Sequence, residues 1–148
     1  MVKRAVVTLF LVGVVGLIGM QFVPYGRDHT NPPVVSEPAW DSPATRATAV
    51  KACFDCHSNQ TVWPWYSNIA PASWLVQHDV DEGRSHLNFS TWKPGDGEEA
   101  SEMVSSGRMP PFQYRLAHPE ANLSDAEKAA FIKGLIATLG GEAGGEAD

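Results

Sequence analysis

The chain is poor in cysteine, in basic residues and in strand-like patterning. Two cysteines occur among 148 residues, so no third or fourth thiolate is present to complete a zinc cage or an iron–sulfur cluster. Lys and Arg number 11 against 17 Asp and Glu, a formal net charge of −6, which argues against nucleic acid and anionic headgroups as partners. No segment alternates at period two and no internal repeat is visible, so we expect an all-α domain.

Both cysteines lie in one short motif, Cys53-Phe54-Asp55-Cys56-His57. This C-x-x-C-H spacing is the attachment pattern of c-type haem. Two thiols three positions apart on a helical turn can each add across one haem vinyl group, and the following imidazole can bind the iron axially. The motif therefore predicts one covalently attached haem c, held by Cys53, Cys56 and His57.

Two other interpretations of the paired cysteines are weaker. One is a structural thiol with a disulfide partner. The other is a thiol–disulfide site of the thioredoxin type, which expects strands and helices to alternate around the motif. The neighbourhood of residues 53–57 does not show that alternation, so haem attachment is favoured.

The N-terminus indicates the compartment in which haem attachment takes place. Lys3 and Arg4 precede an apolar stretch over residues 5–23, and a bilayer core requires about 20 such residues. A cleavable signal peptide, the alternative, has a shorter apolar core and a small-x-small site, which residues 19–25 lack. We predict an uncleaved single-span anchor over residues 1–23. The positive-inside rule then places the C-terminal domain outside the cytoplasm, on the periplasmic side of a bacterial inner membrane, where thioether attachment of haem takes place.

The rest of the chain divides by composition into three parts. After residue 23 about 125 residues remain, enough for one small domain. Four prolines between residues 24 and 40 predict an extended spacer. We expect the haem domain at residues 41–140 and a flexible Gly- and Glu-rich tail at residues 141–148.

Four segments of the domain carry helix signals. Ser42 and Pro43 mark the start of the first, as a cap and a first-turn proline. Ser124 and Glu127 have the spacing of a capping box at the start of the last, and apolar residues follow at helical spacing. The helices are expected at residues 44–51, 71–83, 96–106 and 124–139, with an irregular loop over residues 58–71.

Iron bound by His57 has a second axial position to fill, and Met109 is the candidate. It follows a helix and a glycine and precedes two prolines, so its thioether lies on a stiff, non-helical loop. A methionine ligand raises the reduction potential. The alternative for Met109 is a gap-filler in the core, which is the role expected of Met103. His29 lies in the spacer, too remote to bind; the histidines kept as alternative ligands are His78, His86 and His118.

Aromatic and arginine side chains are candidates for the remaining haem contacts. Trp63, Trp65 and Tyr66 are expected to line the haem pocket, with an indole N–H or the phenol available to a propionate, although such residues also serve as ordinary core. Three arginines could pair with propionates in a bidentate manner, although a solvated role is the alternative for each: Arg84, Arg108 and Arg115.

Several runs of the sequence form a recognisable set. They are SPATR at 42–46, CFDCHSN at 53–59, WPWYSNIAP at 63–71, DEGR at 81–84, HLNFS at 86–90, MPP at 109–111 and LSDAE at 123–127. The set closely resembles the bacterial haem-binding domain family with one c-type motif, over most of residues 31–139. The layout is similar to monohaem class I cytochromes c, so the resemblance implies a small cytochrome c-like helical domain. The Trp-rich segment after His57 departs from that layout.

These features predict a membrane-tethered monohaem c-type cytochrome that transfers single electrons between extracytoplasmic redox proteins. No catalytic residue is expected. One alternative is a haem sensor or small-gas binder, in which Met109 binds weakly or not at all. Another is a haem peroxidase, which is disfavoured because one haem in so short a chain leaves little room for a substrate pocket.

Overall fold

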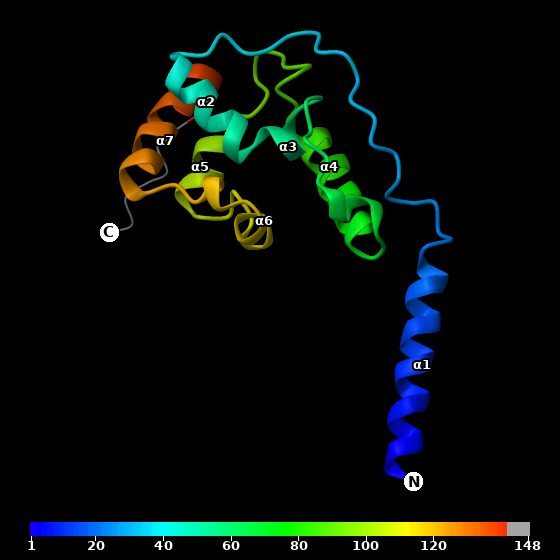
Figure 1. Ribbon diagram of the computed structural model, residues 1–148. Helices are drawn as coiled ribbons and strands as arrows, with labels where there is room; N and C mark the ends of the chain where they lie inside the picture. The colour runs from blue at the N-terminus through cyan, green and yellow to red at the C-terminus, as the bar shows by residue number, and fades with distance from the viewer. Residues whose placement is uncertain (142–148) are drawn as a thin grey trace.

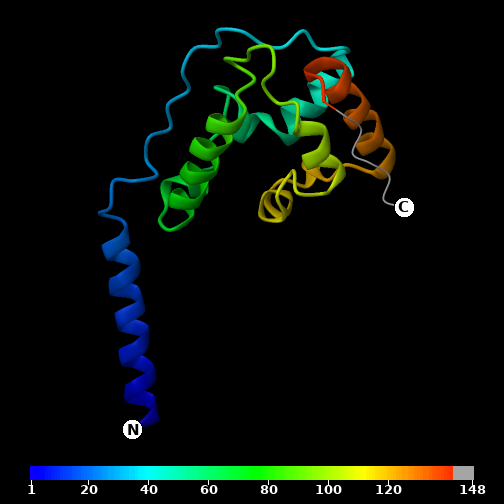
Figure 2. The ribbon, with the colours of Figure 1, turned by 180° about the vertical axis from the view of Figure 1, so that it is seen from behind.

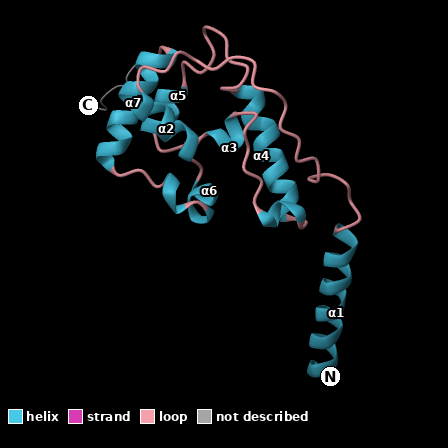
Figure 3. Cartoon of the chain, turned by 45° about the horizontal axis from the view of Figure 1, so that its top comes forward, coloured by secondary structure: helices cyan, strands magenta, loops and turns pink. Residues whose placement is uncertain are grey.

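The computed structural model describes residues 1–141 and shows an all-helical chain. The expected tail at residues 141–148 therefore lies outside the described residues, apart from Gly141. Within the described range there is no strand (Figure 3), and a single isolated parallel bridge joins Ser36 to Thr91. The prediction of an all-α fold is confirmed.

Helix α1 (Val2–Met20) stands away from the other helices (Figure 1). It is long and apolar enough to cross a membrane, and none of its residues is buried. A signal sequence near the N-terminus has the same properties. Some apolar contact outside this chain is needed to cover α1, because water solvates such a surface poorly.

Residues 21–40, which we call the strap, are held against the domain over their length. The strap begins at Gln21, whose side-chain amide exchanges two hydrogen bonds with the backbone of Ala70, at 2.9 and 3.0 Å. Further along, the Val35 amide donates to the Ser90 carbonyl at 2.8 Å. Side-chain bonds also join Asn31 to Thr61, Asn59 to Pro33, Ser36 to Trp92 and Arg46 to Glu37. The segment is extended, as its prolines predicted, but it is bonded to the domain and is not a free spacer.

Two long helices pack across each other at the end of the domain opposite α1. Helix α2 (Pro43–Ala52) and helix α7 (Asp125–Leu139) approach so closely that a Cβ on Gly134 would lie 2.1 Å from the Thr45 hydroxyl oxygen. Helix α5 (Ala100–Ser105) packs on α7. Seven buried side chains form the core cluster: Ala49, Phe54, Phe89, Val104, Phe131, Leu135 and Leu139.

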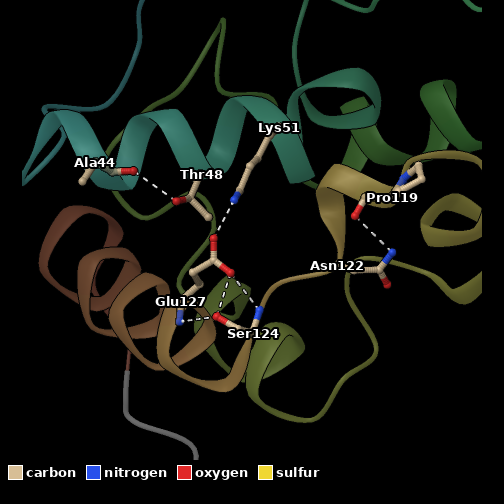
Figure 4. A network of polar contacts seen from close by, with 7 residues as sticks. All are labelled: Ala44, Thr48, Lys51, Pro119, Asn122, Ser124 and Glu127. Atoms are coloured by element: carbon tan, nitrogen blue, oxygen red, sulfur yellow. Dashed lines mark hydrogen bonds and ion pairs between the residues drawn. The ribbon is translucent and has the colours of Figure 1, made fainter.

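Caps fix the starts of these helices where the sequence places them. The Ser42 hydroxyl accepts from the Thr45 amide at 3.1 Å. Figure 4 shows the capping box of α7, in which Ser124 and Glu127 satisfy each other's backbone amides. Lys51 also donates to Glu127 at 3.0 Å, which ties α2 to α7. The Ser124 amide and hydroxyl, together with Lys51, lower the pKa of Glu127 to about 2.

The remaining elements differ from the sequence expectation at their ends. The helix expected at 71–83 continues to His86, whereas the one expected at 96–106 begins only at Ala100. Gly95 and Gly97 have φ values of +97° and +82°. Such values do not occur in a right-handed α-helix, so α5 begins only after these two glycines. These remaining elements are α3 (Phe54–His57), η1 (Trp65–Asn68), α4 (Ala72–His86), α6 (Phe112–Ala117) and η2 (Pro119–Ala121). Of these, η1, α6 and η2 were not predicted.

Candidate functional site

A cavity of about 770 Å³ lies inside the helical domain. Its walls come from α3 and α4 on one side and from α5, α6 and the loops around them on the other, with Leu135 of α7 behind. This volume falls within the range of about 300–1,000 Å³ that is usual for ligand and cofactor sites. Side chains with haem chemistry meet there: Cys53, Cys56, His57, Met103, Met109 and Tyr114.

His57 is oriented by a hydrogen bond to the chain that follows α4. Its Nδ1 lies 3.1 Å from the Leu87 carbonyl oxygen. A carbonyl can only accept, so Nδ1 carries the proton and the lone pair lies on Nε2. Burial lowers the pKa of His57, which keeps the ring neutral. A backbone carbonyl on the far nitrogen is the usual support of a metal-binding histidine.

Cys53 and Cys56 are both free thiols in the cavity wall. Burial raises the pKa of each thiol to about 12, and at Cys56 the charges of Asp79 and Asp55 add to that effect. Both side chains are therefore neutral at neutral pH. A thiol–disulfide site of the thioredoxin type needs a cysteine with a lowered pKa, so this interpretation of the motif is disfavoured by the surroundings.

Helix α4 lies directly on the motif. A Cβ on Gly83 would lie 2.5 Å from the Cys56 carbonyl oxygen, so only glycine permits this approach. The chain after α4 closes the same side, since the Phe89 amide donates to the His57 carbonyl at 2.8 Å. Inside the motif turn, the Ser58 hydroxyl donates to the Phe54 carbonyl at 2.7 Å. We call this side, residues 53–58 with α4, the motif wall.

The arginines lie outside the cavity. Arg84 lies on α4 and donates to the Ser58 carbonyl and to the Asn31 side chain, both at 2.9 Å. Its guanidinium therefore joins α4 to the motif and to the strap. Arg108 pairs with Glu102 at 3.0 Å. Arg115 lines a separate pocket of about 60 Å³. No Lys or Arg lines the main cavity within the described residues; its charged lining residues are Asp79, Glu82, Asp96, Glu98 and Glu99.

The opposite side of the cavity, residues 99–117, we call the methionine wall. Both Met103 and Met109 line the cavity there, whereas Met103 was expected in the core. Their backbones are joined, because the Met109 amide donates to the Met103 carbonyl at 3.0 Å. Met109 also packs against the core cluster. The structure thus brings two thioethers into one cavity with His57.

A hydrogen bond links the methionine wall to the motif wall. The Tyr114 hydroxyl donates to Asp55 Oδ2 at 2.8 Å, and Tyr114 lines the cavity. Burial and the nearby Asp55 charge raise the pKa of Tyr114, so the phenol stays protonated and remains the donor. Sequence reasoning did not select this pair. The two residues are 59 positions apart, and no local pattern joins them.

The aromatic residues expected at the haem do not line the cavity. Trp63 stacks on His29 of the strap, with ring centroids 4.5 Å apart. Trp65 is 76% exposed. The Tyr66 hydroxyl lies 3.3 Å from His118 Nε2. These side chains hold the strap and the segment after the motif in place or face outward.

The alternative histidine ligands are less well placed than the methionines. His86 lines the rim of the cavity, but its side chain is 77% exposed and lies 3.4 Å from Glu82. His118 stacks on Tyr114 at 4.1 Å and does not line the cavity. His78 is exposed on α4.

The donor set fits iron carried in a macrocycle better than a bare ion. Within residues 1–141, no group of three or more His, Cys, Asp and Glu side chains is placed to hold a metal ion. A protein-only site would need about that many ligands. One imidazole, two thiols and two thioethers line the same cavity instead, and such groups could serve as iron ligands and as tethers for a haem.

Comparison with known proteins gives one match. A family model described as a haem-binding domain matches residues 15–137. The matched range includes the strap, the motif and both walls of the cavity, and it begins inside α1. Neither a curated protein nor a solved structure matches the chain.

Proposed function

The chain belongs to the haem-binding domain family, as its sequence runs predicted, and on that premise we propose a c-type haem protein with one covalent haem. Cys53 and Cys56 are the proposed tethers and His57 the proposed axial ligand. One observation carries the proposal: both thiols, the neutral His57 ring and Met109 line the same cavity. The family alone supports haem binding, whereas the covalent attachment rests on this shared cavity.

Different residues have different roles in holding the haem. Each thiol adds its sulfur to one vinyl carbon and its hydrogen to the other, so two side chains become thioether tethers. Leu87 keeps the His57 ring turned with Nε2 free. Phe89 and Leu135, both almost fully buried, contribute apolar lining to the cavity. When bound, haem supplies a one-electron couple between ferric and ferrous iron.

We assign this protein to single-electron transfer at the outer face of a membrane. With His57 and Met109 both bound to the iron, no position would remain open for a substrate, which would suit a carrier. Helix α1 supplies the anchor. The carboxylates at the cavity rim would repel acidic surfaces and steer a basic redox partner toward the haem edge.

A haem sensor or gas-binding domain is the second candidate. It is favoured by the packing of Met109 against the core cluster, because that contact already gives the side chain a structural role. In that case the distal position opens to small ligands.

A reduced-minus-oxidised spectrum, recorded with and without carbon monoxide, tests the carrier against the sensor. For a carrier with His57 and a methionine on the iron, carbon monoxide leaves the reduced spectrum of the full chain unchanged. Ready binding of carbon monoxide by the wild-type protein overturns the carrier assignment and favours the sensor.

Topology is tested separately. A periplasm-only reporter fused after Asp148 should be active, and the protein should stay with membranes through carbonate washing. Release of a soluble form shortened by about 20 to 25 residues, the size of a cleaved signal, contradicts the anchor.

A further inference from the structure

The end of α1 is bonded to one corner of the helical domain. The Gln21 side chain and the Ala70 backbone exchange two hydrogen bonds, at 2.9 and 3.0 Å. A second contact follows at Gly26, whose φ is +81° and where a Cβ would lie 2.6 Å from the Ser73 carbonyl oxygen. The start of α4 therefore lies beside the end of the apolar helix, as Figures 1 and 2 both show.

This corner exposes large apolar side chains. Trp65, Ile69 and Leu75 are 76%, 48% and 50% exposed. All three lie within five residues of Ala70 in the chain. On the strap side of the same junction, Phe22 and Tyr25 are also exposed. We call these five residues the junction patch.

On the strap side of this corner the Arg27 guanidinium donates to the Gln21 carbonyl oxygen, whereas the domain side carries no charge. Residues 58–77 contain no Asp, Glu, Lys or Arg, although the chain as a whole carries a net charge of −6. An acidic domain is repelled by anionic headgroups, so a corner without carboxylates on its domain side is where it can come close to a lipid surface. Trp and Tyr side chains are enriched at the membrane–water interface, because an apolar ring with a polar edge suits that layer.

We propose that the junction patch is a second membrane contact, which rests on the lipid surface next to the point where α1 leaves the bilayer. The proposal rests on α1 being a membrane span. Given that span, the Gln21–Ala70 bonds hold the patch at the level of the headgroups. Helix α4 begins in this corner and, further along, forms one side of the cavity through Asp79, Glu82 and Gly83. Contact of the patch with lipid therefore fixes the orientation of the haem cavity relative to the membrane.

Photo-crosslinking in membranes of cells that express the full chain tests this contact. The crosslinking amino acid p-benzoylphenylalanine replaces Trp65, Phe22 or Val35 in three separate variants. Val35 is the matched control, because it is apolar and 78% exposed but lies 14 positions beyond Gln21 on the strap, where its amide donates to the Ser90 carbonyl. Covalent haem, stained on a denaturing gel, shows that each variant is folded and loaded.

Lipid adducts are expected at position 22 and position 65, several-fold above position 35. Adducts at 22 without adducts at 65 overturn the second contact and leave the anchor intact. Absence of lipid adducts at position 22 overturns the assignment of α1 as a membrane anchor. Protein adducts in place of lipid at 65 assign the patch to a protein partner and overturn the proposal, and so do equal lipid adducts at 65 and 35. If the Trp65 variant carries no haem, the same replacement at Ile69 provides the readout, with the same outcomes.

Discussion

The two walls of the cavity are built in different ways. On the motif wall, α4 presses its Gly83 backbone against Cys56, and hydrogen bonds from Arg84 and Phe89 fix the carbonyls around the motif. The methionine wall is made from short helices, α5 and α6, and a loop that carries Met109. The Tyr114–Asp55 bond ties it to the motif across the cavity.

We propose that this difference separates the attachment of haem from the tuning of its reduction potential. A wall in which backbone touches backbone tolerates almost no change, because neither side has a flexible end to move. A wall that meets the haem with long, unbranched thioethers can adjust. The motif wall should therefore decide whether haem is held, and the methionine wall should decide at what potential and with what access to ligands.

The largest effect is expected from Gly83→Ala. The added Cβ would meet the Cys56 carbonyl at 2.5 Å, so α4 must move away from the motif. Overpacking of this kind costs up to about 3 kcal/mol, and yields of haem-loaded protein should fall with it. Thermal unfolding measures the loss. Ser85→Ala, an exposed change on the same helix, is the control; equal stability of the two variants would break the distinction between the walls.

Met109→Ala should keep the haem but lower its midpoint potential. The thioether stabilises ferrous iron, and since about 59 mV corresponds to a tenfold change in a one-electron equilibrium, a fall on the order of 100 mV is easily resolved. The variant should also bind carbon monoxide. Met103→Ala is the matched comparison, because both side chains line the cavity.

Should Met103→Ala lower the potential while Met109→Ala does not, the distal ligand is Met103. The histidine variants His78→Ala, His86→Ala and His118→Ala should leave potential and gas binding nearly unchanged. A large effect in one of them would transfer the assignment to that histidine.

Tyr114→Phe should have a smaller effect, confined to the methionine wall. It removes the hydrogen bond to Asp55 and keeps the ring. A net loss of about 1 kcal/mol is typical of one hydrogen bond. We expect a lower melting temperature in thermal unfolding with unchanged haem attachment, and Tyr25→Phe should alter neither. Loss of covalent haem in Tyr114→Phe would show that the two walls are not separable.

The smallest effect is expected at Glu127, away from both walls. The pKa of this carboxyl is lowered to about 2, first by the Ser124 backbone and hydroxyl and then by Lys51. A lowered folded-state pKa stabilises the fold above the unfolded-state pKa of about 4.3, and this stability is lost as the pH falls toward 2. In acid titrations, Glu127→Gln should be less stable at neutral pH and lack that part of the pH dependence.

Lys51→Met should keep most of the same pH dependence, because it leaves the capping box intact. Neither variant should shift the haem spectrum. A spectral change in either would connect the helix cap to the cavity and weaken the comparison.

Local signals predicted the parts of the fold that local chemistry determines. The Ser42 cap and the Ser124–Glu127 capping box each mark a helix that begins where expected. The motif selected Cys53, Cys56 and His57 as candidates by spacing alone, and the structure places all three in one cavity.

The parts that sequence reasoning missed depend on contacts between distant residues. Trp63 was expected at the haem, but it stacks on His29, which the strap brings alongside. The strap itself was expected to be a spacer because its prolines indicate extension, and nothing local reveals bonds such as Val35 to Ser90. Met103 was expected in the core because the apolar pattern of a helix does not distinguish a core from a cavity wall.

The most direct test of the central claim is the covalent bond itself. The full chain, expressed with a periplasmic haem-attachment system, should carry one haem that survives denaturing electrophoresis, and Cys53→Ser combined with Cys56→Ser should abolish it. Haem that stays with the wild-type polypeptide through acid-acetone extraction is the predicted result. Complete extraction of the haem from the wild-type protein would contradict the account.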